Sequence, residues 1–204
     1  MDRRTLILSS LAAAAAGPAL AQEAASSPEA GDAPRPAPEG RRAYTKDEVI
    51  RAGSDFLGVA AEAIGGAIEK ISGRYGDQPS AYIAGEEGAG AFGVGARYGK
   101  GLLYLKGQEQ QPVTVYWQGP SVGWDVGGNG SRCFTLCYGL YDAKDIYRRF
   151  PGVDGAAYVV GGLGVNYQRA DGMILAPIRA GVGLRAGVNA GYLAYSRKRQ
   201  WLPF

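Results

Sequence analysis

The chain has 204 residues, with 22 Lys and Arg against 19 Asp and Glu, and it contains no histidine. A net charge of +3 is too balanced to indicate a nucleic-acid-binding protein. Glycine is the outlier at 33 residues, and these glycines are spaced among apolar residues, which favours a tightly curved sheet over a low-complexity chain.

The first 21 residues have the pattern of a signal peptide. A short charged stretch at Asp2–Arg4 precedes the apolar run Thr5–Ala16, and Ala19-Leu20-Ala21 is a small-residue cleavage box. The apolar run is shorter than the roughly 18 residues that a membrane-spanning helix needs. We therefore expect export with cleavage after Ala21, by the general or the twin-arginine route, and no membrane-spanning segment afterwards.

The segment that follows the signal peptide is rich in Ala, Pro, Glu and Ser and has almost no large apolar residue. Such a composition buries too little surface to offset the entropy of ordering it, so we expect a disordered tether over residues 22–44. The remaining residues, 45–204, suit one domain.

This domain is expected to begin with a helix from about Lys46 to Ser72. Thr45 and Glu48 form a capping-box pair at its start. Apolar residues then recur at helical spacing, and we expect them to cover one end or face of a sheet, although Gly53, Gly58 and Gly65-Gly66 weaken the helix. These apolar residues are Leu57, Ala60, Ile64, Ala67, Ile68 and Ile71.

From residue 81 the apolar period changes to two, which is typical of strands separated by glycine-rich turns. The strand candidates are Ala81–Ile83, Ala91–Arg97, Leu102–Lys106, Val113–Gln118, Val122–Val126, Cys133–Leu140, Ala157–Tyr167, Met173–Ile178 and Gly181–Tyr195. A short helix is expected from Asp142 to Phe150, before Pro151-Gly152. This spacing predicts a mostly β protein, a small soluble antiparallel barrel of about eight or nine strands that is closed or nearly closed.

Cys133 and Cys137 are the only cysteines. They stand four apart in an alternating strand, so their Cα atoms should be roughly 13 Å apart, whereas a disulfide needs less than about 7 Å. We expect two unbridged, buried thiols on one face of the strand.

Two motifs in the sequence resemble catalytic or cofactor signatures. Gly119-Pro120-Ser121-Val122-Gly123 matches the nucleophile elbow of serine hydrolases, but that site needs a histidine base, which the chain lacks. Gly88–Gly93 matches a dinucleotide-binding fingerprint, yet the chain continues as a strand where a helix should open. No cluster of carboxylates or cysteines has metal-ligand spacing. We predict no catalytic residue, no cofactor and no metal site, and a protein that is not an enzyme.

Aromatic residues on neighbouring strand candidates are the remaining candidate site. They serve either as barrel core or as the wall of a cavity for an acyl chain or a similar apolar ligand. Cations on nearby strands, Arg97, Lys100 and Lys106, would then meet an anionic head group. The candidate ligand-binding residues are Tyr116, Trp117, Trp124, Phe134 and Tyr138.

Four strings of residues, in order, resemble the EipA-type periplasmic envelope-integrity family. They are Trp117-Gln-Gly-Pro-Ser-Val-Gly-Trp-Asp-Val-Gly-Gly-Asn-Gly-Ser-Arg132, Arg149-Phe-Pro-Gly-Val-Asp-Gly155, Gly161-Gly-Leu-Gly-Val-Asn-Tyr-Gln168 and Leu175-Ala-Pro-Ile-Arg-Ala-Gly-Val-Gly183. The resemblance spans nearly all of residues 46–204. It implies a small soluble periplasmic β-barrel that is needed for cell-envelope integrity, with no established enzymatic activity or ligand.

A weaker similarity links Gly93-Val-Gly-Ala-Arg-Tyr-Gly-Lys-Gly101 to the SYLF (Ysc84-like) lipid-binding domain, and it implies a phospholipid or another envelope lipid as ligand. Two functions are therefore expected for a non-catalytic periplasmic protein. One is binding of an envelope lipid or another apolar ligand. The other is a protein-interaction scaffold with a filled barrel and no ligand, whose partners are envelope proteins. Neither involves nucleic acid.

Overall fold

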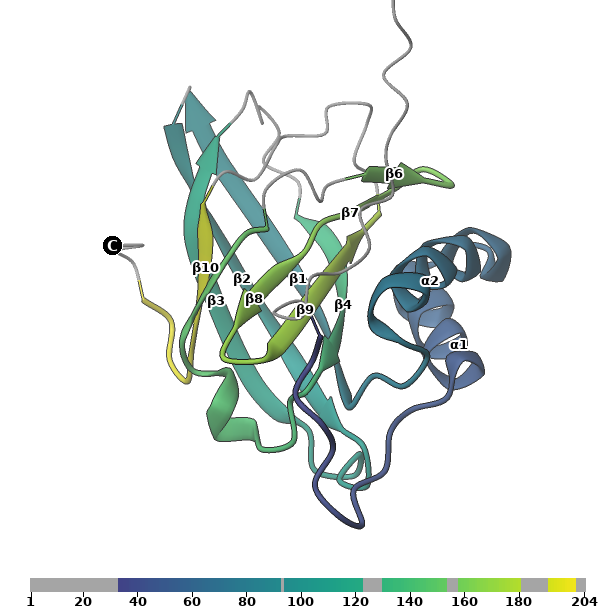
Figure 1. The fold of residues 1–204 in the computed structure, drawn as a ribbon. Helices are drawn as coiled ribbons and strands as arrows, with labels where there is room; N and C mark the ends of the chain where they lie inside the picture. The colour runs from purple at the N-terminus through teal and green to yellow at the C-terminus, as the bar shows by residue number, and fades with distance from the viewer. Residues whose placement is uncertain (1–32, 93, 123–129, 154–157, 181–190, 201–204) are drawn as a thin grey trace, which may run out of the picture.

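A computed structural model describes residues 33–92, 94–122, 130–153, 158–180 and 191–200 (Figure 1). Within these ranges, two helices precede ten strands, and a single turn of 3-10 helix, η1, lies between the fourth and fifth strands. The elements are α1 (Lys46–Leu57), α2 (Ala61–Tyr75), β1 (Ala81–Phe92), β2 (Val94–Leu105), β3 (Val113–Val122), β4 (Ser131–Tyr138), η1 (Ala143–Ile146), β5 (Arg149–Pro151), β6 (Tyr158–Val160), β7 (Leu163–Val165), β8 (Gln168–Ala170), β9 (Met173–Arg179) and β10 (Tyr192–Ser196).

The strands form one antiparallel sheet in the order β5-β10-β3-β2-β1-β4-β9-β7-β6, and β8 also pairs with β9. The sheet curls until β5 meets β8. Gly152, just after β5, bridges to Gln168 of β8, and the amide of Val153 donates to the carbonyl of Tyr167 at 2.9 Å. The predicted antiparallel barrel is therefore confirmed. A two-residue hairpin turn through Asp171-Gly172 joins β8 to β9, with positive φ at both residues.

The N-terminal helical region is two helices, where the sequence predicted one. The capping box at its start is confirmed, because the Thr45 side chain accepts from the amide of Glu48 and the Glu48 carboxylate accepts from the amide of Thr45 at 2.8 Å. The helix ends early because Gly58 takes a left-handed conformation, and its amide donates to the Ser54 carbonyl at 2.9 Å. Glycine at this position is a common helix terminator.

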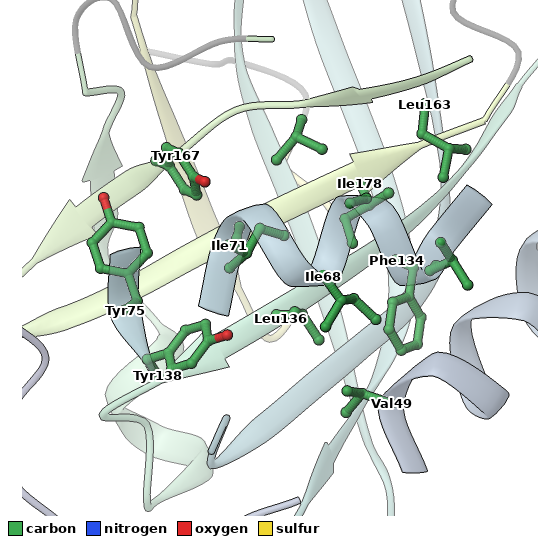
Figure 2. Close-up of a cluster of buried hydrophobic side chains, with 14 of the residues drawn as sticks. Val49, Ile68, Ile71, Tyr75, Phe134, Leu136, Tyr138, Leu163, Tyr167 and Ile178 are labelled. Atoms are coloured by element: carbon green, nitrogen blue, oxygen red, sulfur yellow. The ribbon is translucent and has the colours of Figure 1, made fainter. Parts of the chain in front are cut away.

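The sheet buries both of its faces along β4, so the protein has two hydrophobic cores. Alternate residues Phe134, Leu136 and Tyr138 point to the outer face, where α1 and α2 cover them (Figure 2). Cys133 and Cys137 point into the barrel, and both are free, buried thiols on one face of the strand, as expected. The barrel interior consists of Ala81, Ile83, Leu103, Leu105, Val115, Trp117, Cys133, Cys137, Leu140, Ile146, Phe150, Met173, Leu175, Leu193 and Tyr195.

The helix predicted from Asp142 to Phe150 is mostly absent. Only η1 forms, with Asp142 capping the amide of Lys144 at 2.9 Å. The chain then extends as β5, because Phe150 pairs with Leu193 of β10 and its ring packs edge-on against Tyr195 inside the barrel. Pairing across the sheet therefore overrides the local helical signal.

Two residues in the last part of the predicted tether, Arg35 and Tyr44, lie against the domain, whereas residues 36–42 are exposed. Arg35 contacts the loop after β4 and the β8–β9 turn, and Tyr44 is buried beside Tyr82. Composition alone could not predict this order, since it rests on a few specific contacts. The expected signal peptide, residues 22–32 of the tether, and the strand segments at 123–126 and 181–190 lie outside the described residues. Within the described ranges, neither helix has the length and hydrophobicity required to cross a bilayer.

Candidate functional site

A buried polar cluster crosses the barrel interior above the apolar core. Glu87 reaches it from β1, because odd-numbered residues of that strand, such as Ala81 and Ile83, face inward. Trp117 from β3 and Arg179 from β9 reach it in the same way. The Glu87 carboxylate is only 4% exposed, so its contacts decide whether it is stable there.

Two residues, Trp117 and Arg179, donate hydrogen bonds to this carboxylate. The Trp117 Nε1 donates to one Glu87 oxygen at 3.1 Å, and Arg179 donates to both oxygens, through Nε and through a second nitrogen at 3.3 Å. Arg179 also donates to the side-chain oxygen of Asn166, and the Arg97 Nε lies 3.8 Å from Glu87. The cluster therefore ties β1, β2, β3, β9 and the β7–β8 connection together across the interior.

The indole of Trp117 fills the space beside the cluster. It lies over Gly99 of β2 and Gly85 of β1, so closely that a Cβ on Gly99 would collide with the indole ring. A Cβ on Gly85 would lie 2.7 Å from the indole Cη2 and 2.5 Å from the Lys100 carbonyl oxygen. Glycine is required at both positions because a neighbouring group approaches the backbone itself. No room for a ligand remains between Trp117 and these two strands.

The pKa values of the groups in this cluster lie away from neutral pH. Burial alone raises the pKa of Glu87, but the charges of Arg179 and Arg97, with the hydrogen bonds from Arg179 and Trp117, lower it below its usual value. Burial lowers the pKa of Arg179, but the Glu87 charge raises it above the usual value. Burial raises the pKa of the Cys133 thiol to about 11.

These shifts limit what the cluster can do chemically. A general acid or base works best with a pKa near the operating pH, and a nucleophilic cysteine needs a lowered one. The pKa values of Glu87, Arg179 and Cys133 are instead shifted away from neutral pH. Among the described residues, no group of three or more Cys, Asp or Glu side chains is placed to hold a metal ion.

The aromatic residues predicted to bind a ligand do not share one surface. Trp117 lies inside the barrel, whereas its neighbour Tyr116 is half-buried on the outer face of β3 near Lys100. Phe134 and Tyr138 lie on the outer face of β4, beneath the helices (Figure 2). The fifth of these residues, Trp124, lies outside the described residues. Neighbouring strand residues face opposite sides of a sheet, so adjacency in the sequence could not place these rings together.

Glu87 and Arg179 were missed by sequence reasoning. One signal was present: Glu87 continues the inward alternation of Ala81, Ile83 and Gly85, so an acidic residue stands on a face that is otherwise apolar or small. A carboxylate on such a face requires a buried partner. The sequence does not say which of the later strands supplies it.

The helices leave the outer face of β2 and β3 uncovered (Figure 1). Leu102 of β2 is 37% exposed there, opposite the exposed Thr114 of β3. Tyr104 stacks on Tyr82 with ring centroids 4.8 Å apart. Leu102 and Val159 of β6 are the large exposed apolar side chains among the described residues.

Comparisons with known proteins agree with this fold. The family described as EipA, Envelope integrity protein A, matches residues 42–204. A crystal structure described as a beta-barrel-like, uncharacterized protein from Brucella abortus is 45% identical, with a TM-score of 0.70. The matched region covers 79% of this chain and 99% of the Brucella abortus chain. No curated protein matches significantly. The similarity to the SYLF domain receives no support from these comparisons.

Proposed function

Because the chain belongs to the Envelope integrity protein A family, we propose that it supports the cell envelope as a non-catalytic periplasmic interaction protein with a filled barrel. Partners then dock on its outer surface. The signal peptide expected at residues 1–21 supports the periplasmic location.

The packing around Trp117 is the observation that carries this proposal. Its indole lies inside the barrel against Gly85 and Gly99, and its Nε1 donates to Glu87. The apolar residues beneath it form one continuous buried cluster. A barrel that holds a lipid needs an apolar cavity in this place. The packing of the described interior therefore favours a scaffold over a lipid-binding protein.

The buried titratable groups support a non-catalytic role. The lowered pKa of Glu87 keeps it ionised at neutral pH, where it serves as the partner of Arg179. The raised pKa of Cys133 keeps its thiol protonated. Both are properties of structural groups.

The outer face around Leu102 is the proposed docking surface. Contiguous exposed apolar surface marks interaction sites, whereas a single exposed apolar residue does not, so the neighbours of Leu102 matter. Tyr104 and Tyr116 flank Leu102 and offer both an apolar ring and a hydroxyl, which suits protein interfaces. Lys100 lies next to Tyr116 and adds a cation to this face.

Two matched substitutions test the proposal in a strain that lacks the native gene. Leu102→Glu places a charge on the proposed surface, and Val159→Glu places the same charge on β6, at a site that is equally exposed. We expect the strain that carries Leu102→Glu to lose its resistance to detergent. The variant protein should lose its cross-linked partners, while its melting temperature stays unchanged. Val159→Glu should behave as the wild type.

Equal resistance and equal cross-links for wild type and Leu102→Glu would contradict a docking role for this face. A lowered melting temperature of Leu102→Glu would show that Leu102 stabilises the fold. Leu102→Ser would then replace Leu102→Glu in the test.

A further inference from the structure

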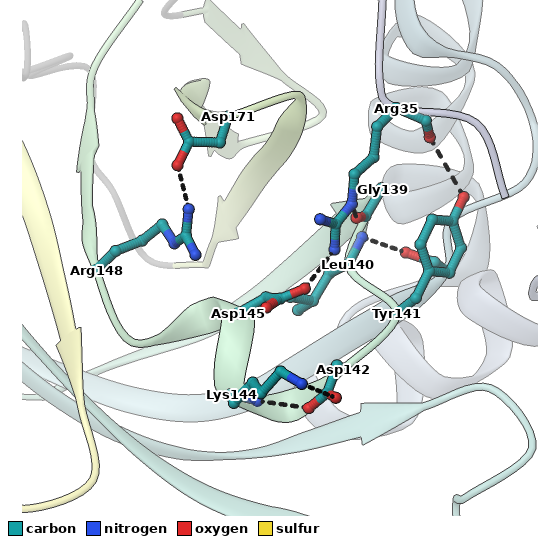
Figure 3. Close-up of polar contacts among 10 residues, drawn as sticks. Arg35, Gly139, Leu140, Tyr141, Asp142, Lys144, Asp145, Arg148 and Asp171 are labelled. Carbon is teal, nitrogen blue, oxygen red and sulfur yellow. Dashed lines mark hydrogen bonds and ion pairs between the residues drawn. The ribbon is translucent and has the colours of Figure 1, made fainter. Parts of the chain in front are cut away.

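One end of the barrel holds an arginine that comes from the segment before the first helix. Arg35 lies between the loop that joins β4 to η1 and the turn that joins β8 to β9 (Figure 3). We call the surrounding residues, Gly139, Tyr141, Asp145 and Gly172, the arginine slot. Three of them accept hydrogen bonds from Arg35, and all four contact it.

The slot contacts both the backbone and the side chain of Arg35. The Arg35 amide donates to the Gly172 carbonyl at 2.7 Å. The guanidinium donates to the Gly139 carbonyl through Nε and to the Asp145 carboxylate at 2.6 Å. The Tyr141 ring lies 5.7 Å from the guanidinium carbon, and its hydroxyl donates to the Arg35 carbonyl at 3.4 Å. Such a set of contacts is specific for arginine, because a lysine ammonium lacks the planar fork.

The slot is shaped by contacts within the domain itself. Gly139 and Gly172 both have a φ of +71°, and a Cβ on Gly172 would lie 3.1 Å from the Arg35 Cβ. The buried Ser80 hydroxyl holds the loop from inside, accepting from the Leu140 amide at 2.9 Å. The capped η1 turn then presents Asp145.

The bound segment is suited to an extended conformation before it binds. Arg35 stands between Pro34 and Pro36, and Pro38 follows. Proline fixes its own φ and disfavours a helical conformation in the residue before it, so Ala33 and Arg35 are both restricted to extended forms. Segments of this kind lose little entropy on docking and are widely used as peptide ligands.

The family match begins at residue 42, so the slot lies inside the matched region and the arginine lies before it. We propose that the slot is a docking site for an extended peptide with a proline-flanked arginine. In the free protein the chain's own residues 33–36 occupy it. A segment of the same chemistry on another envelope protein displaces them. The slot is separate from the Leu102 face, and this proposal does not rest on the function proposed for that face.

The test uses the full chain with Arg35→Ala, which leaves the slot intact and removes its occupant. The probe is a fluorescent peptide with the sequence of residues 33–39, and its anisotropy is measured against protein concentration. We expect the peptide to bind Arg35→Ala and to bind the wild type at least about tenfold more weakly, since the tethered segment competes at an effective concentration of about millimolar.

Two matched controls separate a slot from nonspecific attraction. A peptide with lysine in place of arginine should bind Arg35→Ala at least about tenfold more weakly. Adding Asp145→Asn to Arg35→Ala should weaken binding of the arginine peptide by a similar factor. Circular dichroism establishes that each variant is folded, and Arg35→Lys replaces Arg35→Ala if the latter does not fold.

Two outcomes would overturn the proposal. One is the absence of peptide binding to a folded Arg35→Ala variant at millimolar concentration, which would mean that the slot only holds its tethered segment. The other is equal affinity for the arginine and lysine peptides. Neither outcome bears on the Leu102 experiment, because that face is tested by different variants and a different readout.

Discussion

Replacing Arg179 with methionine should destabilise the protein by about 3 kcal/mol, because it leaves Glu87 charged in the barrel interior. Removing one partner of a buried ion pair costs about 3–5 kcal/mol. In this protein Glu87 would keep the hydrogen bond from Trp117 and the charge of Arg97 at 3.8 Å. At an effective dielectric constant of about 20, that charge is worth on the order of 4 kcal/mol before desolvation. We therefore expect a loss near the lower end of the range.

The loss should shrink as the pH falls from 7 towards 4. In the wild type the pKa of Glu87 is lowered, so the ion pair contributes fully above the unfolded-state value of about 4.3, and this contribution fades as the pH falls through the folded-state pKa. In Arg179→Met, burial should raise the pKa of Glu87, so protonation relieves the variant first. Urea unfolding followed by tryptophan fluorescence at several pH values measures both effects.

A double-mutant cycle assigns the loss to the pair. Glu87→Gln combined with Arg179→Met should be more stable than the sum of the two single losses predicts, by at least about 1 kcal/mol. A cost below about 1 kcal/mol for Arg179→Met, independent of pH and additive with Glu87→Gln, would refute the reasoning that this ion pair fixes the interior.

Three further results are expected. Gly99→Ala should lower the free energy of unfolding by about 1–3 kcal/mol in urea titrations, because its Cβ meets the Trp117 indole, and an unchanged midpoint would mean that the indole moves freely. Thr45→Ala should cost about 0.5–2 kcal/mol by thermal unfolding through loss of the capping box, whereas Thr45→Ser should cost less. Cys133 should resist a thiol reagent at pH 8 until urea unfolds the protein, since burial raises its pKa to about 11, and rapid labelling of the folded protein would contradict this.

Local signals in the sequence predicted the parts of the fold that local interactions decide. The Thr45 capping box forms as expected, because it depends on a few neighbouring residues. The alternation after residue 81 predicted an antiparallel, strand-rich domain, but the candidate Ala91–Arg97, expected as one strand, covers the end of β1 and the start of β2. Gly58 also carried a helix-ending signal, although a single glycine inside a helical pattern does not by itself distinguish a break from a weak point.

Features that depend on distant partners could not be predicted. Phe134 and Trp117 face opposite cores because α1 and α2 cover only one part of the sheet, and no local pattern reports which strands the helices cover. Glu87 of β1 reaches Arg179 of β9 because both strands flank β4 in the sheet. The sequence of neither strand indicates this order. Arg35 lies in a segment whose composition indicates disorder, but four polar contacts hold it.

Native mass spectrometry of the mature protein, purified gently from the cells that produce it, tests the filled-barrel account most directly. Lipid extraction of the same sample identifies any co-purifying ligand. The account predicts the mass of the bare polypeptide, because Trp117 and the apolar cluster beneath it occupy the interior. A stoichiometric lipid retained under these conditions would contradict the account and establish the barrel as a lipid-binding site.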